Sequence, residues 1–567
     1  MGSSSVPPGP GIRPAGDTPT RFRLLPLRLL VAGRFGLAPG RLHRLDAGGV
    51  EALLDRTRPR LALRVDDLLR ADGTALTVEL AFAHRRDFEP GAVARAVPEL
   101  ARLLDTPSPA TSAAPAAATA AAAPAVAEGS GDDALDRLLG MVDAPGAGSV
   151  AEPVDPARAA VSGFIAGISR RPAAARSAEG PDASVEDRLA AQIAAIIGHP
   201  EFQALERGWA ALRFLLRRIE RGGTLTIDVA ETGEEDVAAT LEPLVPEDDP
   251  DPAGPVRIVV DLGDYGGSDR DIGRLRRLAG FGAARRAVVL ANAAVAFSGD
   301  GGPEAVAAMH DPETLFDAAP YAAWRTLRDD ADAAWLGLCL TRVALRDAGD
   351  GQRDKALRFA RPYRIGQPLD AGAAPAVAAL FASAAAATDW PCAVGTAVQP
   401  VVDNLTLVEA AGDGFDGPIR PAPSARAADS LAAAGLIVLV AERGRDTARL
   451  LRVPSVRRPP TRDDAAEVSL ITRLFQAQVV HGLQWNADRL FAGDDHATVR
   501  DRVEAYLAAL VSATGPGAAA EVRVDRDDDD TPILVIHVRS GARAAPGAAM
   551  AFDIPLAPPA PQPGTDR

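Results

Sequence analysis

The stretch His199–Glu220, HPEFQALERGWAALRFLLRRIE, decides the fold class of the larger part of this chain. Its apolar residues recur every three or four positions, and this spacing places them on one stripe of a helix: Phe202, Leu205, Trp209, Leu212, Leu216 and Ile219. Such a stripe is typical of a helix that packs on a sheet in the core of a domain. The sequence therefore predicts that Phe202, Leu205 and Trp209 anchor a large domain to its own sheet.

The composition excludes several classes of protein. The 567 residues include 61 basic and 76 acidic side chains, which give a formal charge of −15 and argue against a nucleic-acid partner. We find no run of 18 apolar residues and no apolar core of a signal peptide, so direct membrane insertion is not expected. Two cysteines, Cys339 and Cys392, are too few for a disulfide framework. We therefore expect a cytoplasmic bacterial protein.

The clearest boundary in the chain is a linker rich in alanine and proline. Residues Thr106–Ala127 hold 12 alanines and 4 prolines in 22 positions, and the prolines interrupt any alanine helix. The organisation predicted from this boundary is a flexible arm at 1–20, a small α/β domain at 21–105, the linker at 106–131, two short helices within 132–184, a larger α/β domain at 185–555 and a flexible tail at 556–567.

Helices and strands alternate within the larger domain, which predicts a mixed α/β (α+β) fold. After the opening helix, strands are expected at 225–229, 256–262 and 288–291, with a helix at 272–284 between the last two. Further segments extend the pattern: strands at 436–440 and 533–538, and a long helix or helix pair at 465–491.

No motif for catalysis or for a cofactor stands out. The GDYGG turn at 263–267 lacks the spacing of a dinucleotide or P-loop motif, and no G-x-S-x-G occurs. The seven histidines lie more than five residues apart, which excludes H-E-x-x-H helices. The acidic run at 526–530 reads best as a solvated hairpin tip between two strands. We therefore predict no catalytic, cofactor or metal site, although distant residues can converge in the fold.

The larger part resembles TssC (VipB), the large sheath subunit of the type VI secretion system. The opening helix matches the family's H-P-x-F-Q-x-L-E start, and residues 317–346 match its W-R-x-x-R-x-x-x-D-A pattern. The matching residues that carry this second motif are Trp324, Arg325, Arg328 and Asp332. Their helical spacing predicts that Arg325, Arg328 and Asp332 share one face as an ion-pair set.

The first part resembles TssB (VipA), the small sheath subunit. Residues 22–36 resemble that family's P-F-R-I-L-V-L-G-D-F-S-G opening, and residues 80–104 resemble its D-F-x-P-x-x-V segment followed by V-P-E-L. The chain therefore looks like a natural TssB–TssC fusion. Two departures stand out, because the linker replaces the small subunit's later helices and the E-Y-G-x-x-G-G stretch of the large subunit is not found near 231–255.

The resemblance implies a structural protomer and not an enzyme. Sheath proteins of this family assemble into a helical polymer around a tube of Hcp protein, on a baseplate, and contract to deliver effectors. The family also has an N-terminal helix in the large subunit that the AAA+ unfoldase ClpV binds. By position and pattern, the counterpart here is an amphipathic helix at 132–143 with the apolar residues Leu135, Leu138, Leu139 and Val142.

Two alternatives stay open at this point. The chain fits an α/β enzyme, a hydrolase or a nucleotide-binding protein, whose site is assembled from distant residues. It also fits a soluble adaptor that keeps the sheath fold without contracting.

Overall fold

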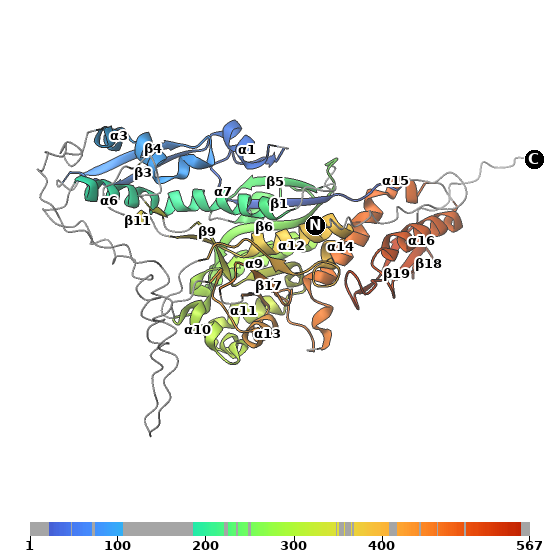
Figure 1. The fold of residues 1–567 in the computed structure, drawn as a ribbon. Coiled ribbons are helices and arrows are strands. Elements are labelled where there is room, and N and C mark those ends of the chain that lie inside the picture. The colour runs from blue at the N-terminus through green and yellow to red at the C-terminus, as the bar shows by residue number, and fades with distance from the viewer. Residues whose placement is uncertain are drawn as a thin grey trace, which may run out of the picture.

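The computed structural model describes residues 22–46, 48–70, 74–105, 185–219, 225–233, 236–247, 251–346, 349–350, 357, 364–365, 368–407, 417–441, 444–461, 463–492 and 495–556. We call residues 22–105 the first segment and residues 185–556 the second segment. In Figure 1 much of the first segment, drawn in blue, lies along one side of the molecule beside α6 (Val185–Ile197) and α7 (Pro200–Arg218), and the C-terminal elements α16 (His496–Ser512), β18 (Ala519–Arg526) and β19 (Pro532–Arg539) lie at the opposite end.

A seven-stranded sheet forms the centre of the molecule and takes strands from both segments. Its order is β15-β8-β7-β6-β1-β5-β2. The pairs are parallel except for β2, which runs antiparallel to β5. The strands are β1 (Leu27–Gly33), β2 (Leu42–Arg44), β5 (Leu225–Glu231), β6 (Val256–Tyr265), β7 (Val288–Ala293), β8 (Leu336–Cys339) and β15 (Leu436–Ile437).

The two faces of this sheet bury two separate apolar clusters, because alternate residues of each strand point to opposite faces. Leu29 and Val31 of β1 belong to one cluster, and Leu30 and Ala32 belong to the other. The first face is covered by α7 (Pro200–Arg218), α12 (Ala374–Thr388) and α14 (Leu470–Trp485). The second is covered by α8 (Val237–Leu241), α9 (Asp269–Arg285), α11 (Ala322–Arg328) and α13 (Ala425–Ala433). The mixed α/β class predicted from the sequence is confirmed.

The rest of the first segment packs beside the sheet as a hairpin with short helices. Strands β3 (Arg60–Asp66) and β4 (Ala75–Ala81) pair antiparallel, and α6 (Val185–Ile197) contacts β3 from the second segment. The helical stretch between Pro90 and Asp105 is interrupted at Val97, which adopts extended backbone before Pro98. The helical pieces of this segment are α1 (Gly49–Thr57), the short 3-10 turn Arg85–Phe88, α2 (Pro90–Ala96) and α3 (Pro98–Asp105).

The C-terminal part is a helical pair against a three-stranded sheet. The long helix expected at 465–491 ends as α14 at Trp485 and resumes as α15 (Ala487–Leu490), with the buried Asn486 between them. After α16 (His496–Ser512), strands β18 (Ala519–Arg526), β19 (Pro532–Arg539) and β20 (Ala549–Pro555) form an antiparallel sheet. The acidic run therefore lies at the hairpin tip between β18 and β19, as predicted.

Smaller elements complete the second segment. They include α10 (Gly302–Ala308) and three minor sheets. The first sheet consists of β9 (Arg342–Arg346), β12 (Leu369–Gly372) and β14 (Ile419–Arg420), and the second of β13 (Val401–Val402), β16 (Leu439–Ala441) and β17 (Ala448–Leu450). The third consists of β10 (Gly349–Asp350) and β11 (Arg364–Ile365).

Helix α7 approaches the first segment so closely that a glycine is required. A Cβ atom on Gly208 would lie 2.2 Å from the carbonyl oxygen of Arg34. We expect Gly208→Ala to destabilise the protein by about 1–3 kcal/mol, because the helix must move away from the backbone at Arg34. Gly280→Ala in α9 is the matched control, since its nearest neighbour would be 3.7 Å away. That variant should be about 1 kcal/mol more stable, from helix propensity. Urea unfolding measures both, and equal effects would contradict the close approach.

Candidate functional site at the junction of the two segments

The backbone of β1 joins the two segments most directly. Strand β1 comes from the first segment, yet it pairs on one edge with β5, from Leu27 opposite Leu225 to Gly33 opposite Glu231. On its other edge it pairs with β6 of the second segment. All seven residues of β1 are buried. The strand is therefore an internal part of the second segment's sheet.

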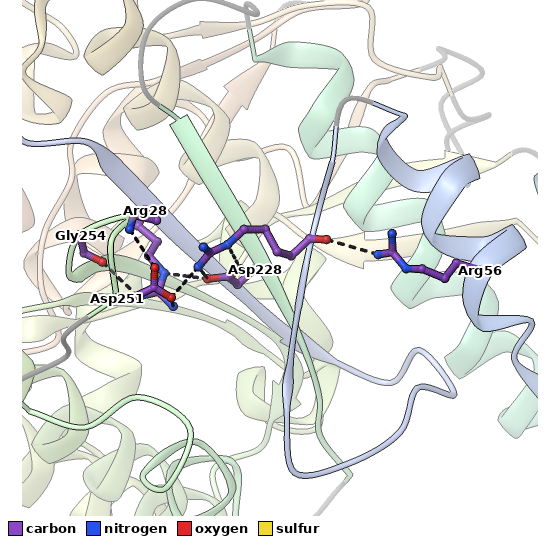
Figure 2. Close-up of polar contacts among 7 residues, drawn as sticks. Arg28, Arg56, Asp228, Asp251 and Gly254 are labelled. Carbon is purple, nitrogen blue, oxygen red and sulfur yellow. Dashed lines mark hydrogen bonds and ion pairs between the residues drawn. The ribbon is translucent and has the colours of Figure 1, made fainter.

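A cluster of two arginines and two aspartates crosses this junction, and Figure 2 shows Arg28, Asp228, Asp251 and Gly254 gathered beside the strands. The Nε atom of Arg28 lies 2.7 Å from Oδ2 of Asp228, and both side chains are almost completely buried. Arg44 reaches the other oxygen of Asp228 at 2.9 Å and Asp251 at 2.7 Å. Arg28 also pairs with Asp251 at 3.1 Å and donates to the Gly254 carbonyl at 3.0 Å. We call these four charged residues the junction cluster.

The charges of the junction cluster stabilise one another. Burial acts to raise the pKa of Asp251, but hydrogen bonds from Arg44 and the Ala253 backbone, with the charge of Arg28, lower it below its ordinary value. Hydrogen bonds to Asp228 and Asp251 raise the pKa of Arg44. Desolvation of two charges is costly, and it is offset here because both oxygens of Asp228 accept charge-assisted hydrogen bonds.

A second carboxylate holds the loop that follows β1. Glu231, at the end of β5, accepts hydrogen bonds from the backbone N–H groups of Phe35 and Leu37, both at 2.9 Å. Burial raises the pKa of this carboxyl, and the two backbone bonds oppose that effect. Ligands of open α/β sheets bind beyond the carboxyl ends of the strands. At this position the carboxylate of Glu231, and not a ligand, accepts the hydrogen bonds of the backbone N–H groups of Phe35 and Leu37.

The stripe of α7 contacts the first segment. Trp209 donates from Nε1 to the Phe35 carbonyl at 3.0 Å, and the two rings meet edge to face at 5.4 Å. The Phe202 ring lies 5.9 Å from that of Phe82 and 6.0 Å from that of Phe88. Leu205, the third predicted residue of this stripe, also lies beside Gly36 of the first segment. All three residues are buried, as expected. Their partners were expected in the larger domain alone, but they include residues of the first segment.

A polar contact fixes the hairpin of the first segment to α6. The Gln192 side chain is buried, accepts from the Leu68 N–H at 2.6 Å and donates to the Asp66 carbonyl at 3.0 Å. Both hydrogen-bonding groups of one amide therefore bridge the segments.

The charged residues of this junction were missed by the sequence analysis. Their signal was present, since Arg28 interrupts the apolar run LRLLVAG and Asp228 interrupts LTIDVAE. A charged side chain in a strand that is otherwise buried needs a partner of opposite charge.

The second predicted motif, from Trp324 to Asp332, lies outside the junction, and its residues make other contacts than those predicted. Trp324 is buried against Phe297, at a ring distance of 5.1 Å. Helix α11 ends at Arg328, so Asp332 lies in the following 3-10 turn and not on the same helix face. Arg325 donates to the carbonyls of Phe316 and Ala318, and Arg328 donates to those of Val456 and Ala433. The prediction of a shared ion-pair set is therefore wrong.

The remaining predictions concern the helix at 132–143, metal ligands, membrane spans and the two cysteines. Leu135, Leu138, Leu139 and Val142 lie outside the described residues. Among the residues that the structure describes, no cluster of three or more histidine, cysteine or acidic side chains is arranged to hold a metal ion. In the same ranges, no helix is both long and apolar enough to cross a bilayer. Both cysteines are buried and unpaired with each other, and burial raises the pKa of the Cys392 thiol to about 12.

The junction cluster generates a direct test of stability. Asp228→Ala should destabilise the protein by about 3–5 kcal/mol, because it leaves Arg28 buried without its closest counter-charge. The double variant Arg28→Met with Asp228→Leu should cost less than the single one. Asp488→Ala is the control, because its pair with Arg23 also joins the segments but is exposed, and it should cost below about 1 kcal/mol. Urea unfolding followed by tryptophan fluorescence measures all three, and a mild effect of Asp228→Ala would contradict the assigned role.

Comparisons with known proteins match the two segments to two sheath families. Residues 25–108 match the family described as Type VI secretion system, VipA, and residues 182–250 and 252–457 match the VipB (EvpB) tail sheath N-terminal domain. A relative, the type VI secretion system sheath protein TssC1 of Pseudomonas aeruginosa, is 26% identical over 202 residues. That match spans 33% of this chain and 41% of the relative.

A solved structure also shows similarity, the helical sheath of the anti-feeding prophage (AFP) in its contracted state. It is 13% identical with a TM-score of 0.32, and the match covers 61% of this chain and 77% of that one. The family matches cover more than half of the chain and fall on either side of the junction. The chain therefore belongs to the type VI secretion sheath proteins, with a VipA (TssB) domain and a VipB (TssC) domain in one polypeptide.

Proposed function

We propose that this chain is a structural protomer of a type VI secretion sheath. The observation that supports it best is β1, the strand of the VipA-type segment that pairs on both edges with strands of the VipB-type segment. One polypeptide thereby supplies both sheath domains in a single folded unit. We propose further that the protomers polymerise as a helix around a tube of Hcp protein on a baseplate, and that contraction of this polymer drives effector delivery.

Unpaired strand edges are the proposed contacts between protomers. In the described part of the chain, β18 and β20 are the outer strands of the C-terminal sheet, and each pairs on one edge only. Such edges accept a strand from another chain. A contact of this type that joins different surfaces of successive copies does not close on itself, and it therefore builds a helical filament.

The proposed function needs no bond chemistry. In the described residues, the polar groups of the junction cluster and Glu231 are occupied by partners within the protein. We therefore propose that the chain is not an enzyme and that its important residues make contacts.

Electron microscopy tests the assembly. The full chain, expressed with an Hcp tube protein, should form tubules or rings with a central lumen. Asp228→Ala should reduce their yield several-fold, because the sheet that holds both segments is weakened. The exposed control Asp488→Ala should assemble normally. Folded monomers of the unmodified chain, without polymer at any concentration tested, would contradict the sheath function and favour an adaptor.

We also propose a recycling contact. By resemblance to the family, residues 132–143 would bind a ClpV-type AAA+ unfoldase through Leu135, Leu138, Leu139 and Val142. Short amphipathic helices commonly dock in apolar grooves of partner proteins.

Changing those four residues together to serine should reduce capture by the cognate unfoldase at least about tenfold, as expected for a loss of apolar anchors. A matched control replaces four alanines of the linker, Ala116, Ala117, Ala120 and Ala121, with serine and should leave capture unchanged. A pull-down with purified unfoldase measures both, and equal capture by all three chains would rule out this contact.

A further inference from the structure

The residues that precede β1 contact the C-terminal part of the chain at the break between α14 and α15. The side-chain amide of Asn486, which is completely buried, accepts a hydrogen bond from the Arg23 N–H at 2.7 Å and donates one to the Arg23 carbonyl at 3.1 Å. One side chain therefore pairs with both backbone groups of one residue, as a neighbouring strand would do. Such a contact fixes the path of the backbone at Arg23.

Two further contacts join the same residues to the C-terminal helices. The Phe22 ring meets the Tyr506 ring of α16 edge to face, with 4.8 Å between the ring centres. Nη2 of Arg23 lies 2.9 Å from Oδ2 of Asp488 in α15, and this ion pair is exposed, so it contributes little. The Asn486 amide and the Tyr506 ring are therefore the main contacts. We call residues 22–26 the strap.

The other end of the strap is fixed to the central sheet. Pro26 is buried, and β1 follows it directly between β5 and β6. Gly254, just before β6, lies so close to Pro26 that a Cβ atom on it would be 2.9 Å from the proline ring. Leu24, in the middle of the strap, is 75% exposed. The strap therefore connects the C-terminal helices to the sheet through its two ends.

The polypeptide itself enters the C-terminal part at a break in a helix. We call α15, α16 and β18–β20 the C-terminal unit. Its helix α16 packs on β18 and β19, and the unit contacts α14 through α16 and β20. Asn486, which joins α14 to the unit, leaves the helical conformation with φ −111° and ψ 13°. Residues at the ends of helices commonly absorb the rotation when one part of a protein turns on another. The break at Asn486 is therefore a candidate hinge.

We propose that the strap fixes the orientation of the C-terminal unit on the central sheet, and that the unit turns about the break between α14 and α15 when the strap leaves Asn486 and Tyr506. Because the strap continues into β1, the first segment then controls the orientation of a unit at the far end of the chain. This device is a property of one folded chain and does not depend on polymerisation. In a polymer that uses the edges of β18 and β20, the strap would also set the direction of those edges.

Double electron–electron resonance between pairs of spin labels tests this device in the full chain. Labels on Arg270→Cys in α9 and Glu521→Cys in β18 measure the distance from the sheet to the unit, and both positions are exposed. Labels on Asp501→Cys in α16 and Glu521→Cys measure a distance within the unit. The native Cys339 and Cys392 are completely buried and stay unlabelled. Without further changes, each pair should give one narrow distance distribution.

Two variants release the strap from opposite sides. Asn486→Leu removes both hydrogen bonds to Arg23 at nearly constant volume, but it also removes a bond to the Gly482 carbonyl within α14. Phe22→Ala combined with Arg23→Pro avoids this effect, because it removes the ring contact and the N–H donor from the strap alone. Leu24→Ala is the control, since it changes an exposed side chain of the strap.

Both strap variants should broaden the distribution from the sheet to the unit at least about twofold, as expected when a hinge is released. The distribution within the unit should stay narrow, and Leu24→Ala should change neither. Equally narrow distributions from the sheet to the unit in all chains would overturn the proposal. Broadening within the unit would overturn it too, because the strap would then maintain the fold of the unit and not its orientation.

Discussion

The structure depends on the insertion of β1 between β5 and β6. A strand with partners on both edges and apolar clusters on both faces contributes to the whole sheet at once. Without it, the hydrogen-bonding edges of β5 and β6 would face each other across a missing strand. The second segment is therefore an incomplete fold without the first. The two family domains of this chain therefore form one structural unit. The short strand β2 of the first segment also pairs with β5, so the first segment supplies a second strand of this sheet.

The junction cluster restricts how β1 can insert. Because side chains alternate between the two faces of a strand, a slip of one residue would turn Arg28 away from Asp228 and exchange the residues that fill the two apolar clusters. An apolar residue at position 28 would fill the space equally well, but it would tolerate such a slip better. The ion pairs therefore contribute more to the choice of register than to net stability, since desolvation consumes much of their attraction.

The sequence predicted the elements of this fold better than it predicted their partners. The stripe of α7 follows from local periodicity, and the strands β5, β6 and β7 follow from short apolar runs, so both were found correctly. The partners of the stripe, Phe35, Phe82 and Phe88, are more than 100 residues away in the sequence, and the helical spacing of the stripe does not identify them. The error at Arg325, Arg328 and Asp332 has the same origin, because helical spacing was extended past the point where tertiary contacts end the helix.

The junction also defines what the linker does. The end of α3 and the start of α6 already lie close together, since Leu103 and Val185 line one cavity of about 320 Å³ beside β3. The connection through residues 106–184, which includes the linker, therefore joins two points that the folded junction brings together. Its physical effect is on association: a strand supplied by a separate chain must be captured at its cellular concentration, whereas a tethered strand is present at a high effective concentration. The tether therefore fixes a one-to-one ratio of the two domains, while the stability of the joined state comes from β1, Asp228 and the α7 stripe.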